Sequence, residues 1–215
     1  MKNKNNMKKK SKKRGRENFW RKNFIESWNY IKSSKRYIYF SICVFILFFL
    51  IGLVLQTPAE IQEAIKQLLQ ELLDKTKDFG VFEMIMFIFK NNLTVSIVGL
   101  VFGAIFCIVP FFFAVSNGYV LGYVVKTVFE KVAGISALTS LWRLFPHGIF
   151  ELPAIFISLG LGLRLGVSLI KFLNKNSFGI FWKDFKDSMR VLFFIIIPLL
   201  IIAAIIEGIL IIFLK

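Results

Sequence analysis

Long runs of apolar residues recur along this chain and limit it to a small set of folds. The first run, residues 37–55, contains no charged side chain. At about 1.5 Å of rise per helical residue, a run of this length matches the ~30 Å hydrocarbon core of a bilayer. Further runs follow at about 93–113, 114–129, 148–172 and 191–214. The pattern predicts an all-α, polytopic transmembrane helix bundle of about five spans, accompanied by amphipathic interfacial helices.

The positive charge of the chain is concentrated at its N-terminus. The net charge is +15, and half of the 28 Lys and Arg residues precede Tyr37. Anionic lipid headgroups attract such a segment, so we expect the lipid bilayer, and not nucleic acid, to be its partner. We predict that residues 1–18 form a disordered basic tail and that residues 19–36 form an amphipathic helix on the membrane surface. Residues 37–215 then make up the transmembrane domain.

A second amphipathic helix is expected outside the membrane at residues 57–78. Its apolar side chains recur at spacings of three and four, and charged and amide side chains occupy the opposite face. The apolar stripe would pack on the bundle, on the headgroup boundary or on a partner protein.

Charge in the connecting segments indicates the topology. Residues 56–92 carry six acidic and four basic side chains, whereas residues 164–190 carry six basic and two acidic ones. Basic segments stay in the cytoplasm, so the two regions should lie on opposite sides of the membrane. This requires the weakly apolar run at 114–129 to cross completely. We therefore expect a multi-pass cell-membrane protein with a cytoplasmic N-terminus and an external C-terminus; a re-entrant third segment is the rival prediction.

One polar turn lies at the start of the fourth run. His147, the only histidine, precedes Glu151 by four residues, so on a helix the two share one face. Ionisable residues inside a bilayer are costly and are often functional. We expect both to point into the bundle as a polar intramembrane site, together with polar residues from nearby segments: Asn91, Asn92, Asn117 and Arg143. Such a site either relays protons, binds a metal or a substrate, or holds broken helices together.

No complete catalytic or metal-binding set accompanies this pair. A zinc site needs three or four ligands, and the chain has one histidine and two cysteines. The order His-Gly-x-x-Glu also differs from the His-Glu-x-x-His motif of zinc proteases. We therefore expect no catalytic residue, no metal and no cofactor, and we favour a structural role for His147 and Glu151.

Small residues recur every four positions in three of the expected spans. They are Gly99 and Gly103; Ala114, Gly118 and Gly122; and Ala154, Ser158, Gly162 and Gly166. In lipid, helices associate by close packing, and faces of small residues let the backbones approach. We predict that the second, third and fourth spans pack tightly together through these faces.

Three short motifs lie between residues 91 and 166. They are Asn91-Asn92 before an apolar span; Asn117-Gly118 followed by Gly122; and Pro146-His147-Gly148 with Glu151-Leu152-Pro153-Ala154 and a glycine-rich continuation through Arg164. Together they resemble the stage II sporulation protein M family. The resemblance implies a polytopic cytoplasmic-membrane protein. In spore-forming bacteria the namesake is a membrane scaffold that works with cell-wall hydrolases during engulfment, but relatives also occur where there is no sporulation.

These observations favour a non-enzymatic membrane scaffold or assembly factor, with membrane proteins or further copies of the chain as partners. A transporter or channel component with a polar site at His147 and Glu151 is the main alternative, because helices broken at prolines can line such a site. An intramembrane hydrolase that uses the same two residues is a third hypothesis.

Overall fold

The computed structural model describes residues 2–105, 107–131, 147–175 and 178–213, and every regular element within these ranges is helical. In chain order the elements are α1 (Lys2–Ser33), α2 (Lys35–Val54), α3 (Ala59–Thr76), α4 (Val81–Ile105), α5 (Ile108–Lys131), η1 (His147–Glu151), α7 (Leu152–Lys175), α8 (Phe178–Val191), η2 (Leu192–Ile196) and α9 (Ile197–Phe213). The elements η1 and η2 are single π-helical turns that lead into α7 and α9.

Within the described ranges, five helices are long and apolar enough to cross a membrane. They are Lys35–Val54, Val81–Ile105, Ile108–Lys131, Ile149–Asn174 and Phe178–Phe213. The predicted all-α, polytopic bundle is therefore confirmed. The last helix has 36 residues, or about 54 Å, which exceeds a hydrocarbon core of about 30 Å. One end of this helix must therefore extend beyond the core, and the charged residues of α8 place that end at its start.

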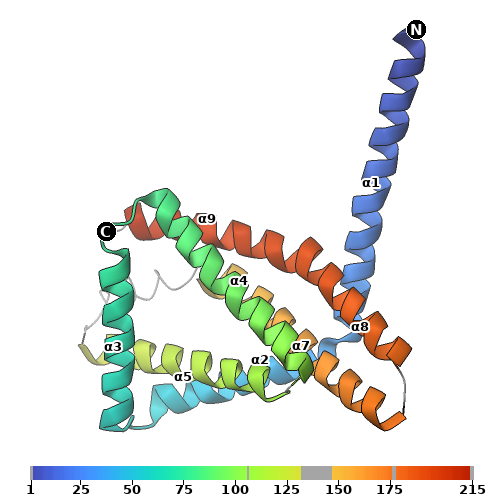
Figure 1. Ribbon diagram of the computed structural model, residues 1–215. Coiled ribbons are helices and arrows are strands. Elements are labelled where there is room, and N and C mark those ends of the chain that lie inside the picture. The colour runs from blue at the N-terminus through green and yellow to red at the C-terminus, as the bar shows by residue number, and fades with distance from the viewer. Residues whose placement is uncertain (1, 106, 132–146, 176–177, 214–215) are drawn as a thin grey trace.

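Helices α2 and α5 lie side by side and run in the same direction (Figure 1). A Cβ atom added to Gly118 would meet the carbonyl group of Phe45, and one added to Gly122 would meet that of Phe49. Residue numbers therefore increase in the same direction along both helices, which means that α2 and α5 are parallel. Two parallel spans need one full crossing between them in the chain, and α4 supplies it.

Helices α4 and α7 are also parallel. A Cβ on Gly162 would meet the carbonyl group of Gly99, and Gly166 lies against the carbonyl group of Gly103. Because α5 lies between α4 and α7 in the chain, it must cross the membrane completely if its neighbours run in the same direction. Its 24 residues are long enough for this. The geometry thus favours five crossings over a re-entrant third segment.

The second and third spans differ from the expected ranges 93–113 and 114–129. Helix α4 ends at Ile105, and α5 begins at Ile108, so that Pro110 lies in the first turn of α5. Proline costs little there, because the first N–H groups of a helix have no intrahelical partner. Asn117 and Gly118 lie inside α5.

Both π-helical turns in the described residues end two residues before a proline. Pro153 follows η1 and Pro198 follows η2. A proline cannot donate a backbone hydrogen bond, and its ring clashes with the carbonyl group four residues earlier, so the preceding turn widens. In η2 the N–H of Ile197 accordingly bonds to the carbonyl of Leu192. The widened turn keeps α8 and α9 in one helix, which begins well before the predicted span at 191–214.

Helices α1 and α3 run across the direction of α2, at opposite ends of it (Figure 1). If α2 crosses the membrane, the two helices lie on opposite membrane faces. The structure extends α1 through most of the tail, residues 1–18, that was expected to be disordered, and its many Lys and Arg side chains are compatible with a helix. Helix α3 lies inside the expected range 57–78.

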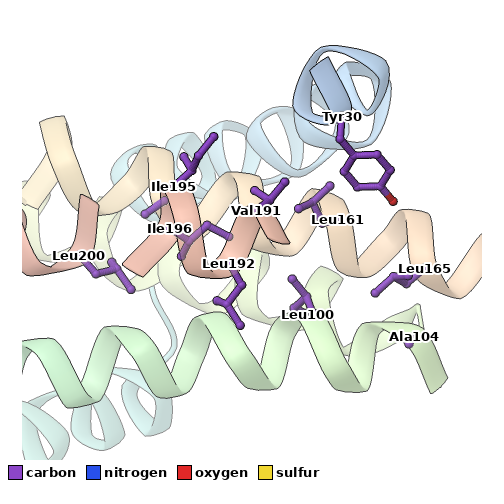
Figure 2. Close-up of a cluster of buried hydrophobic side chains, with 11 residues drawn as sticks. Tyr30, Leu100, Ala104, Leu161, Leu165, Val191, Leu192, Ile195, Ile196 and Leu200 are labelled. Carbon is purple, nitrogen blue, oxygen red and sulfur yellow. The ribbon is translucent and has the colours of Figure 1, made fainter. Parts of the chain in front are cut away.

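The main apolar core lies where α4, α7 and the α8–η2–α9 helix meet (Figure 2). Leu100 of α4, Leu161 and Leu165 of α7, and Ile196 of η2 are fully buried in it. Tyr30 of α1 reaches the edge of the same cluster. The C-terminal part of α1 is therefore packed into the fold and is more than an appendage to it.

Candidate functional site

Glu151 lies in η1 at the start of the fourth span, with 1% of its surface exposed. Because η1 packs against α9, the carboxyl group of Glu151 lies in the interior of the bundle. His147 begins the same turn, but only its backbone belongs to the described part of the chain, and Arg143 lies outside that part. The expected pairing of His147 with Glu151 therefore stays a prediction.

Asn91 and Asn92 lie in the middle of α4, because this helix begins well before residue 93. Asn92 is buried, with 6% exposed, whereas Asn91 is exposed. The Asn91 Nδ2 atom donates to Asn92 Oδ1 at 3.5 Å. Extending the parallel register of α4 and α7 places Asn92 about one helical turn from the level of Glu151. Asn92 is thus the asparagine whose position suits the expected polar site.

Asn117 does not belong to the polar site, contrary to the expectation from sequence. Its side chain is exposed on the outside of α5, and Nδ2 donates to the carbonyl group of Phe113 at 2.8 Å. The reason is its neighbour Gly118, which faces α2 and so fixes the rotation of α5. Neighbouring residues on a helix point about 100° apart, and Asn117 is therefore turned away from the contact.

The small-residue faces pack in two separate helix pairs. Helices α4 and α7 approach each other through Gly99, Gly103, Ser158, Gly162 and Gly166. Within this contact the hydroxyl group of Ser158 donates to the carbonyl group of Ser96. Gly118 and Gly122 of α5, by contrast, pack on the first span, α2. The prediction had placed all three faces in one contact among the second, third and fourth spans.

A polar cluster that was not predicted from the sequence lies where α1, α2, α7 and α8 meet. We call it the Arg164 cluster, and it consists of Tyr30, Ser33, Ser34, Arg164, Ser168 and Asp184. The Arg164 Nη1 atom donates to Ser33 Oγ at 2.6 Å and to Ser34 Oγ at 2.7 Å. Its guanidinium carbon lies 4.1 Å from the centroid of the Tyr30 ring. A planar guanidinium with five donors can serve several acceptors and a ring at once, which a lysine cannot.

Asp184 accepts further hydrogen bonds within the cluster. Its Oδ1 atom accepts from Arg164 Nη2 at 2.9 Å. The Tyr30 hydroxyl group donates to Asp184, with the backbone carbonyl oxygen at 3.1 Å and Oδ1 at 3.2 Å. The Asp184 Oδ2 atom accepts from Ser168 Oγ at 2.9 Å. Burial raises the pKa of the Tyr30 hydroxyl above its ordinary value, so this group remains a donor at neutral pH.

The Arg164 cluster fastens helix α1 to the bundle. The side chains of Arg164 and Asp184 are 20% and 12% exposed, so water screens their ion pair only weakly. A second ion-paired group adds to the attachment, because Arg190 of α8 lies 3.1 Å from Glu26 of α1 and 2.7 Å from Asp187. A signal for this contact was present in the sequence, because Arg164 continues a glycine-rich apolar run where an unpaired cation would be costly.

A cleft of about 1230 Å³ opens beside the Arg164 cluster. The last turns of α1, the junction of α1 with α2, the second half of α7 and one face of α8 form its walls. Glu151 does not line this cleft. Among the described residues, no three His, Cys, Asp or Glu side chains come close enough together to hold a metal ion.

Comparison with known proteins gives a family match over most of the chain. A family model described as stage II sporulation protein M matches residues 41–210. An uncharacterized protein of Methanocaldococcus jannaschii is 34% identical over 128 residues, which cover 58% of this chain and 54% of that protein. The chain therefore spans about half the length of this curated relative. No solved structure matches the chain.

Proposed function

We propose that this chain, which belongs to the stage II sporulation protein M family of integral membrane proteins, acts as a non-enzymatic scaffold or assembly factor. It would act in the cell membrane, with its N-terminus in the cytoplasm and its C-terminus outside. In this role the bundle anchors two transverse helices, α1 and α3, and these helices contact other membrane proteins or further copies of the chain.

The observation that carries this proposal is the uncovered surface of α1 and α3. On α3 only Ile65 is buried, whereas the remaining stripe is exposed, up to 68% for Leu73. On α1 the exposed aromatic side chains include Trp20, Phe24 and Trp28. Because both helices lie across the ends of the spans (Figure 1), their apolar stripes are available to the headgroup region and to proteins within it.

The transporter alternative depends on Glu151, since a buried carboxylate inside a span is a functional candidate by default. A transport site also needs a path for water or substrate to reach that residue. Glu151 is 1% exposed and does not line the cleft beside the Arg164 cluster. Both observations favour a bundle interior that water does not reach at Glu151. We therefore assign Glu151 to the packing of η1 against α9.

Site-specific photocrosslinking in the native membrane tests the scaffold proposal. A photoreactive phenylalanine analogue replaces Phe24 of α1 or Leu73 of α3 in the full chain. The matched control replaces Phe102, which is 47% exposed near the C-terminal end of the span α4. We expect discrete protein adducts from the first two positions, formed with a second copy or with a protein that also copurifies without crosslinking, and lipid adducts from Phe102.

The same preparation separates the scaffold from a transporter. Purified protein and its Glu151→Gln variant are reconstituted into liposomes, and proton and solute flux are measured against empty liposomes. A scaffold gives no flux above the empty control for either protein. Flux that depends on Glu151, combined with lipid adducts alone at Phe24 and Leu73, would assign the protein to transport instead.

A further inference from the structure

We propose that the cleft beside the Arg164 cluster is a binding site for the phosphate group of an anionic phospholipid. The cleft has a volume of about 1230 Å³ and is bounded by four helices that meet on the face of the bundle where α1 lies. This space is large enough for a phospholipid headgroup and its bound water.

The charge of the cleft favours an anion. Basic side chains outnumber acidic ones in its lining, and the acidic residues are Glu26, Asp184 and Asp187. Each of these three carboxylates is already paired with Arg164 or Arg190. The remaining basic residues form no ion pair with another described residue, and they are Lys32, Lys35, Arg36, Lys171 and Lys183. Their charge is therefore available to a ligand.

The arrangement of these cations suits a phosphate group. Lys35 and Arg36 come from the first turn of α2, Lys171 from α7 and Lys183 from α8, so they approach the cleft from different sides. Lysine and arginine form strong, charge-assisted hydrogen bonds to phosphate oxygens. The Arg164 cluster lines part of the cleft and holds its walls together, so that the site is organised before the ligand binds.

The depth of the cleft in the membrane favours a lipid over a soluble phosphate compound. Lys35 and Arg36 begin a transmembrane span, and Tyr37, the next residue, also lines the cleft. On α8 the rings of Phe178 and Trp182 stack beside it and are about half exposed. Exposed aromatic rings at the end of a span mark the headgroup region of a bilayer. A phosphate bound here could keep its acyl chains in the adjacent hydrocarbon.

Lipid binding to the purified full chain in a neutral detergent tests this proposal. Native mass spectrometry measures the dissociation constants for phosphatidylglycerol, for phosphatidylcholine and for soluble glycerol phosphate. The cleft variant is Lys171→Gln/Lys183→Gln. The matched control, Lys10→Gln/Lys12→Gln, removes the same charge from the N-terminal tail. Lys171 and Lys183 form no ion pair with another described residue, so the cleft variant should fold, and the unfolding temperatures of both variants check this.

We expect the cleft variant to bind phosphatidylglycerol on the order of tenfold more weakly than the unmodified chain, because two cations near the headgroup are lost. The tail variant should stay within about twofold, since general attraction by a distant charge is weak beyond the screening length. Phosphatidylcholine and glycerol phosphate should bind much more weakly than phosphatidylglycerol.

Three outcomes would overturn the proposal. Equal losses in the cleft and tail variants would show nonspecific attraction by the basic chain. Equal binding of phosphatidylcholine would show that the headgroup charge does not matter. Glycerol phosphate that binds as tightly as phosphatidylglycerol would identify a soluble phosphate compound, and not a lipid, as the ligand.

Discussion

Arg164 shows how a charged residue is kept in an apolar helix. Its guanidinium group donates to two serine hydroxyl groups and to the Asp184 carboxylate, and it stacks on the Tyr30 ring. Removal of one partner from such a set leaves the other with an uncompensated charge or an unused donor, which costs more than the net value of the original contact. The stability of the cluster therefore depends on each of these residues individually.

The first prediction concerns Asp184. Asp184→Asn removes the charge that compensates Arg164, and we expect the free energy of unfolding in detergent to fall by about 2 kcal/mol. Asp187→Asn is the matched control on the same helix, because Asp187 pairs with Arg190 at a more exposed position and should cost less than about 1 kcal/mol. Equal losses in both variants would contradict the central role of Asp184.

A second prediction concerns the coupling between Tyr30 and Asp184. Tyr30→Phe removes the hydroxyl group that donates to Asp184 and should cost about 1 kcal/mol. In the double variant with Asp184→Asn the two losses should add to less than their sum, because the Asp184 carboxylate is one of the acceptors of the Tyr30 hydroxyl group. Proteolysis within α1 should become faster in either variant. Strictly additive losses would show that the two residues act independently.

At the scale of the helices, glycine decides which pairs approach closely. At Gly162 and Gly122 the nearest atom of the neighbouring helix belongs to its backbone, so an added methyl group cannot be accommodated by a rotamer change. Gly162 faces the carbonyl group of Gly99, and Gly122 faces that of Phe49. The α4–α7 and α2–α5 contacts hence depend on glycine at these positions.

The third prediction tests these contacts. Gly162→Ala and Gly122→Ala should each lower the free energy of unfolding by about 2 kcal/mol, because the two helices must move apart. Gly179→Ala in α8 is the control, since an added Cβ there would have no atom within 4 Å, and alanine is the better helix former. Thermal unfolding of the three variants in one detergent checks the difference. A loss in Gly179→Ala as large as in the others would contradict the packing argument.

At the scale of the whole molecule, the directions of the helices determine the topology. The parallel pairs α2–α5 and α4–α7 each enclose one intervening crossing, so the chain changes side with every span. Helices α1 and α3 then occupy opposite membrane faces (Figure 1). The basic N-terminal segment favours the cytoplasm for α1.

The fourth prediction follows from this arrangement. In a variant with Cys43→Ala and Cys107→Ala, single cysteines are introduced as Asn18→Cys in α1 or Gln70→Cys in α3, and intact cells are treated with a membrane-impermeant maleimide. We expect Gln70→Cys to react in intact cells and Asn18→Cys to react only after permeabilisation. Reaction of both from the same side would require an even number of crossings between α1 and α3.

Several features of the fold could be predicted from local sequence. Hydropathy over about 20 residues identifies a span, and the difference in charge between residues 56–92 and 164–190 requires the run at 114–129 to cross. The exact limits of the spans could not be predicted as well, because a proline such as Pro110 is tolerated both in the first turn of a helix and between two helices. Asn117 was misplaced for a related reason, since only contact with α2 sets the rotation of α5.

The sequence by itself determined that this chain forms apolar helices, how many there are and which ends carry positive charge, because these properties depend on residues close together in the chain. Only the tertiary structure decided that Gly118 packs on α2 and that Arg164 meets Asp184 and Tyr30. Tyr30 and Asp184 are separated by 154 positions, and their contact depends on the rotation and register of three helices. Those quantities are set by the packing of the whole bundle, which no local pattern encodes.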